Sequence, residues 1–192
     1  MRVETVICHY DELQSKVLPY LRGQVFHVTH DRGFTGIVES GFVKAGGELR
    51  SNTKTGAVVQ FGPSRGYPCL VDLRDASDAV IETTLRDYYY FLDPFSDSAE
   101  NVFLLLESAE YELLIANEVG LNYSGAAAVP EVEVWYPKTL PLSKIRTAIR
   151  VPIRRADPFS AIDTTVLLEI AAKGAATIKG GRRINGPKKK PA

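Results

Sequence analysis

Residues 24–41, QVFHVTHDRGFTGIVESG, constrain the fold most, because an apolar run that carries two histidines changes directly into a helical pattern. The alternation over Val25–Thr29 predicts a β-strand. Apolar residues then recur at helical spacing, so we expect a helix that Asp31 caps and Gly41 ends. A chain with this stretch must fold so that a helix leaves the end of a histidine-bearing strand.

A second stretch, Glu131–Leu142 (EVEVWYPKTLPL), alternates its side chains in the manner of a strand. The pattern predicts a strand that Pro137 ends, with the carboxylates of Glu131 and Glu133 on one face. Two carboxylates held on one rigid strand make this stretch a candidate catalytic element.

The two stretches together resemble the ADP-ribosyltransferase superfamily, and within it the DarT-like enzymes that modify DNA bases. FHVTH is similar to the YHITH-like strand of those enzymes, and IVESGF is similar to their helix with an IxxxG end. Glu133 stands eight residues before Pro141, the interval that follows the catalytic glutamate in that family. The resemblance implies an α+β fold with a split mixed β-sheet core and flanking helices.

By this resemblance the chain cleaves the nicotinamide–ribose bond of NAD, which is a substrate, through an oxocarbenium-like ribosyl cation. Glu133 is implied as the catalytic glutamate, whose negative charge stabilises that cation and whose oxygens accept a hydrogen bond from the ribose 2′-OH. His27 is implied to bind a ribose of NAD as a neutral ring of fixed tautomer, with Thr29 supporting it.

Two neighbouring residues compete for these roles. His30 lies in the opposite strand phase to His27, so we expect it to start the helix. Glu131 shares the predicted face of Glu133 and is a candidate general base for the acceptor. A satisfied histidine of the core is the alternative reading of His27.

The resemblance implies further contacts with NAD. Residues 43–56 are rich in Gly, Ser, Thr and Asn, which predicts a loop. Such a loop would close over the dinucleotide with Arg50 at a phosphate, although a solvated surface loop accounts for the composition equally well. In the following segment an aromatic side chain would stack on nicotinamide, and both Phe61 and Tyr67 are candidates.

The composition predicts one domain over residues 1–172, because 192 residues with 45% hydrophobic side chains can bury a core unaided. Lys and Arg balance Asp and Glu at 23 each, so no overall field steers the chain to nucleic acid or membrane. Cys8 and Cys69 lack metal-ligand spacing, so we expect reduced thiols and no metal. Without a signal peptide or a membrane span in the pattern, we expect a cytoplasmic protein.

Residues 173–192 contain Gly, Lys and Arg but no acidic residue, which predicts a disordered basic tail. Such a tail holds phosphate backbones in a salt-dependent way, and the tyrosines at 88–90 form a candidate stacking platform for bases. The resemblance to DarT-like enzymes implies a nucleic-acid base as acceptor, as in a DNA-modifying toxin, although the sequence leaves open DNA, RNA, protein or a small molecule, and a housekeeping role.

Two alternatives stand beside the transferase. The first is a catalytically inactive module that binds nucleic acid or a protein through the tyrosines and the tail. The second is an RNA 2′-phosphotransferase on the same fold, which the chain favours less because it has no convincing cluster of basic residues for a phosphate.

Removal of residues 179–192 is expected to leave folding and NAD hydrolysis intact while weakening nucleic-acid binding. The segment has little to bury, and it carries the cationic side chains Lys179, Arg182, Arg183, Lys188, Lys189 and Lys190. Affinity for single-stranded DNA at low salt, compared between the full and truncated chains, checks this. Equal affinities would discard the idea that the tail positions a substrate.

Overall fold

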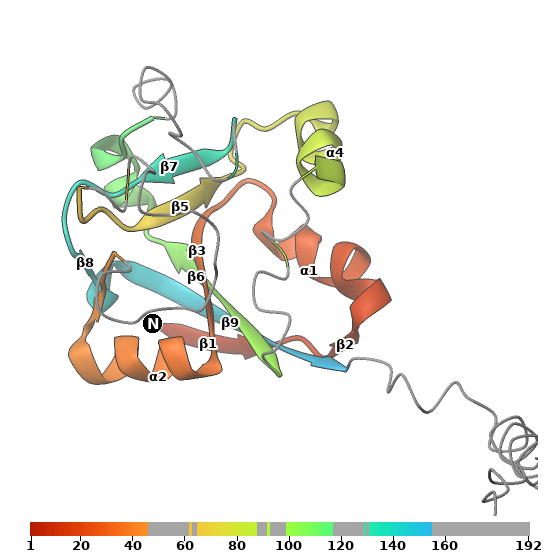
Figure 1. The fold of residues 1–192 in the computed structure, drawn as a ribbon, viewed down its shortest axis with the longest axis horizontal. Helices are drawn as coiled ribbons and strands as arrows, with labels where there is room; N and C mark the ends of the chain where they lie inside the picture. Colours follow the sequence, from red (N-terminus) through yellow and green to blue (C-terminus); the bar gives the residue numbers. More distant parts are fainter. Residues whose placement is uncertain are drawn as a thin grey trace, which may run out of the picture. The chain divides into compact units, whose positions relative to one another are not determined.

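A mixed β-sheet forms the core of the unit Met1–Arg154 (Figure 1). Its strands lie in the order β1 (Arg2–Thr5), β9 (Ile145–Arg154), β6 (Glu100–Leu106), β3 (Val25–His30), β5 (Cys69–Asp72) and β7 (Glu133–Trp135). Strand β2 (Cys8–His9) extends the sheet beside β9, and β4 (Phe42–Val43) pairs separately with β8 (Leu140–Pro141). β1 and β2 run parallel to β9 and the other pairs are antiparallel, which confirms the predicted α+β class with a mixed sheet.

The computed structural model describes residues 1–45, 62, 65–87, 92, 99–116, 129 and 131–154. All of them belong to the unit Met1–Arg154. The predictions on Arg50, Phe61, the tyrosines at 88–90, the domain end at 172 and the tail fall outside the described residues.

Strand β6 is the buried centre of the sheet, between β9 and β3. Every residue from Asn101 to Leu106 is buried, as its continuous apolar sequence predicts. The neighbouring strand β9 runs past Pro152 and ends at Arg154. Strand β1 pairs with β9 as far as Arg150, and β2 pairs with it from Ile153. The nitrogen of Pro152 points to this edge of β9, between the two pairings, so its missing N–H costs no ladder hydrogen bond.

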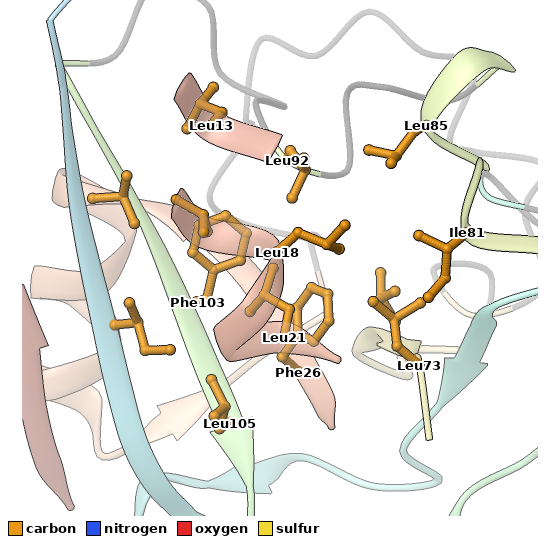
Figure 2. Close-up of a cluster of buried hydrophobic side chains, with 14 of the residues drawn as sticks. Leu13, Leu18, Leu21, Phe26, Leu73, Ile81, Leu85, Leu92, Phe103 and Leu105 are labelled. Atoms are coloured by element: carbon orange, nitrogen blue, oxygen red, sulfur yellow. The ribbon is translucent and has the colours of Figure 1, made fainter. Parts of the chain in front are cut away.

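One face of the sheet is covered by α1 (Leu13–Leu21) and α4 (Asp78–Asp87). Figure 2 shows leucines of α1 pointing at Phe26 and Phe103, whose rings pack edge to face with centroids 5.8 Å apart. The apolar residues of α1 recur at helical spacing and all four are buried: Leu13, Val17, Leu18 and Leu21. We call this surface of the sheet the Phe26 face.

The other face carries α2 (Asp31–Ser40), whose Ile37 packs with Val25, Leu70 and Leu104. His30 is the N-cap of α2, since its Nδ1 accepts a hydrogen bond from the Gly33 amide at 3.3 Å. The predicted cap at Asp31 is therefore wrong by one residue, because the histidine side chain reaches back to the first turn. Gly41 ends the helix at φ +73°, as predicted.

Leu21→Ala tests how far the α1 packing holds the Phe26 face together. Leu21 is fully buried, so its truncation should cost about 2–5 kcal/mol of unfolding free energy. Urea unfolding monitored by circular dichroism measures the change. Tyr20→Ala is the matched control on the exposed side of the same helix and should change stability by about 0.5 kcal/mol or less.

Candidate functional site

The sheet separates between β3 and β5. Strand β3 pairs with β6 over five residues, from Phe26 to His30, but with β5 only through Val25 and Phe26. On its other edge β5 pairs with β7 through Cys69, Leu70 and Val71, with Cys69 opposite Trp135. The two central strands therefore part immediately after Phe26, at the position of His27.

His27 occupies the point of separation. Its half-buried ring places Nδ1 2.9 Å from the carbonyl oxygen of Cys69. A carbonyl oxygen can only accept, so Nδ1 carries the proton and Nε2 is left as an acceptor. Burial lowers the pKa of His27, outweighing the opposite effect of the Cys69 carbonyl. The ring is therefore neutral at neutral pH, with one tautomer selected.

Thr29 shares the His27 face of β3 but is covered by the start of α2. Only 6% of Thr29 is exposed, and a Cβ added at Gly33 would lie 2.2 Å from its Oγ1. Glycine at position 33 thus permits close approach of the helix to the strand. Thr29 is packed beneath α2 and is not exposed beside His27.

Glu133 is buried at the start of β7, with 2% of its surface exposed. Its Oε2 accepts a hydrogen bond from the Val129 amide and its Oε1 accepts one from Trp135 Nε1, both at 2.9 Å. The Glu133 amide also donates to the Val129 carbonyl at 3.0 Å. Side chain and backbone of Glu133 together close the turn that leads into β7.

Glu131 lies in that turn, exposed and with φ +71°. The prediction of one strand carrying both glutamates on a shared face is therefore wrong. The alternating sequence fits a strand, but the bonds between Glu133 and Val129 hold the chain in a turn directly before β7. A left-handed residue at 131 then removes Glu131 from the strand, so Glu131 and Glu133 are not paired carboxylates.

His27 and Glu133 are on opposite faces of the sheet. Phe26 pairs with Val71 and Val71 with Glu133, so these three residues share the Phe26 face. His27, one residue along β3, points to the face that α2 covers. Strand β5 lies between the two, and the structure does not bring them together as direct neighbours.

Trp135 is bonded to Glu133 and also packs against side chains from other segments. It is fully buried and packs in a small cluster with Tyr67, Cys69 and Ile115, apart from the two main clusters. Among the described residues, Tyr67 is therefore tied to Glu133 through the indole. Sequence reasoning missed Trp135, although its position two residues after the glutamate predicted the same strand face.

The backbone of Gly62 covers the indole edge. A Cβ there would lie 2.2 Å from Trp135 Cδ1 and 3.0 Å from Cys69 Sγ, so a side chain at position 62 is excluded. Burial, followed by the charge of Glu133, raises the pKa of the Cys69 thiol well above its ordinary value. The thiol is protonated and is no nucleophile.

The opposite face of β7 has its own buried carboxylate. Tyr136 Oη donates to Glu110 Oε2 at 2.7 Å, and Lys144 Nζ lies 2.6 Å from Glu110 Oε1. Burial and the Glu110 carboxylate raise the pKa of Tyr136 to about 12. Both Glu110 oxygens are bound by protein groups, which explains the cluster as a structural link between β7 and the segments before and after it.

Comparison of the chain with protein-family models, curated proteins and solved structures finds no match. Within the described residues, no three His, Cys, Asp or Glu side chains are grouped so that they could hold a metal ion. The described helices are all too short or too polar to cross a bilayer.

The protonation of His27 predicts a pH dependence of stability. Below the ordinary histidine pKa of 6.5, the unfolded chain binds a proton that the folded chain, with its depressed pKa, does not. The stability that neutral His27 contributes above pH 6.5 is therefore lost as the pH falls toward the pKa of folded His27.

Thermal midpoints measured from about pH 8 to about pH 5 check this. His27→Gln should show a shallower decline than the wild type, because its amide can donate to Cys69 but does not titrate. Parallel declines in the two proteins would contradict a buried neutral His27.

Proposed function

We propose that the chain is an NAD-dependent ADP-ribosyltransferase. The bond between nicotinamide and ribose C1′ breaks with its electron pair leaving on nicotinamide. C1′ then bonds to an acceptor nucleophile that loses a proton. A nucleic-acid base is the acceptor we favour. The observation that carries the proposal is the neutral His27, held in one tautomer where β3 and β5 part.

The short ladder between β3 and β5 supports a split sheet. Two residue pairs join these strands, against five between β3 and β6. A ligand that meets polar groups where strands separate needs donors and acceptors held at fixed positions. His27 Nε2 supplies one such acceptor, which a ribose hydroxyl matches as donor.

Glu133 supplies the negative charge in this proposal. Two N–H donors hold its carboxylate at one position on a strand, which is the preorganisation that stabilises a developing cation. A carboxylate accepts about four hydrogen bonds, so a ribose hydroxyl can add to the bonds from Val129, Trp135 and the Cys69 thiol. With Glu133 only 2% exposed, the reaction requires that nucleotide binding uncover it.

The same burial favours a second candidate, a catalytically inactive binding module. In that case Glu133 does no more than close the turn onto Val129, and His27 only satisfies the Cys69 carbonyl. The two candidates differ in whether NAD is consumed.

Incubation with NAD labelled on the adenylate, with single-stranded DNA, RNA, protein or no acceptor, separates them. Nicotinamide release with label on one acceptor supports the transferase. Unchanged NAD in every mixture, with the chain folded by circular dichroism, would reject it in favour of the binding module.

Glu133→Gln should reduce nicotinamide release by about 100-fold or more, because it removes the charge that stabilises the ribosyl cation. It should also lower the thermal midpoint, since the amide NH₂ of glutamine must face one of two N–H donors. The rate is therefore measured well below the midpoint and expressed per folded molecule.

Glu131→Gln is the matched control, because Glu131 is exposed and outside β7. It should leave nicotinamide release unchanged, and a loss of transfer alone would assign Glu131 to the acceptor. A folded Glu133→Gln protein that cleaves NAD at the wild-type rate would refute the proposed role of Glu133.

A further inference from the structure

Trp135 makes an interaction with Glu133 that the packing of an aromatic side chain does not require. The indole and the carboxylate are on the same face of β7, two residues apart, and Nε1 donates to Oε1 at 2.9 Å. Both side chains are buried, so the bond forms out of water, where a hydrogen bond to a charged acceptor is strong.

The indole also contacts β5, the strand whose Cys69 carbonyl accepts the hydrogen bond from His27. Trp135 packs on Cys69, which lies opposite it on β5, and the carbonyl of Cys69 accepts the hydrogen bond from His27. The backbone N–H and C=O of Trp135 both bond to Ile115 on the far side of β7. Cys69 is paired with Trp135 without hydrogen bonds between the two, so the backbone N–H and C=O of Cys69 point toward β3. One residue thus contacts both the carboxylate and the segment that orients the histidine.

We infer that Trp135 is a positioning residue that fixes the Glu133 carboxylate for the ribosyl cation and keeps Cys69 in place behind His27. The inference rests on the proposed function, because it assigns Trp135 to the reaction and not to folding alone. Loss of the indole N–H should leave NAD binding nearly unchanged and slow the chemical step, since Glu133 then loses its fixed position.

The sequence permits a test of this one hydrogen bond. Trp135 is the only tryptophan, so biosynthetic replacement of tryptophan by 3-benzothienylalanine changes no other residue. The analogue has the shape of indole with sulfur in place of the N–H. It retains the packing against Tyr67 and Cys69 and removes the N–H that donates to Glu133.

The expected result is a fall in kcat for nicotinamide release of about 10- to 100-fold, with KM for NAD within about threefold of wild type. Tyr136→Phe is the matched control, because it removes the buried donor to Glu110 at the residue that directly follows β7. It should lower the thermal midpoint as much as the analogue does but leave kcat unchanged.

Three results would overturn the inference. Wild-type kcat in the analogue protein means that Trp135 only packs, and an equal kcat loss in Tyr136→Phe means that the effect is general destabilisation. Either leaves the transferase standing. If the wild-type chain releases no nicotinamide, the proposed function fails and the positioning role fails with it. Trp135→Phe, assayed in parallel, should reproduce the kcat loss if the analogue protein does not fold.

Discussion

The hydrogen bond from His27 to the Cys69 carbonyl permits the sheet to separate between its two central strands. Where a ladder ends inside a protein, the next carbonyl lacks its strand partner, and leaving it unsatisfied costs about 1–3 kcal/mol. His27 supplies the missing donor from its side chain at 2.9 Å. The strands can therefore part after two residue pairs without an unsatisfied carbonyl at Cys69.

The two faces of the sheet are covered by different helices and carry different polar groups. The Phe26 face is closed by α1 and α4 around a continuous apolar cluster (Figures 1 and 2). Glu133 lies on this face with both of its carboxylate oxygens hydrogen-bonded. The opposite face carries α2, which begins at Asp31 directly after β3 and is capped by His30. In the proposed reaction, a nucleotide must meet groups from both faces, which is possible only where the strands part.

Local patterns in the sequence predicted the elements that local interactions determine. The β3–α2 unit, the stripe of α1 and the buried strand β6 follow from side-chain period and terminal residues. The predicted strand at Glu131 failed because bonds between Glu133 and Val129, which alternation does not encode, hold the chain in a turn there. The opposite faces of His27 and Glu133 depend on strand β5 lying between them, and pairing order is a property of the whole fold.

The tautomer of His27 tests the account most directly. Long-range proton–nitrogen NMR correlations on ¹⁵N-histidine-labelled protein, assigned by comparison with His27→Gln, distinguish the two ring nitrogens. We predict a protonated Nδ1 and an unprotonated Nε2 at neutral pH, as donation to the Cys69 carbonyl requires. A proton on Nε2 alone, or an imidazolium ring at neutral pH, would contradict both the bond that ends the ladder and the acceptor assigned to the ribose.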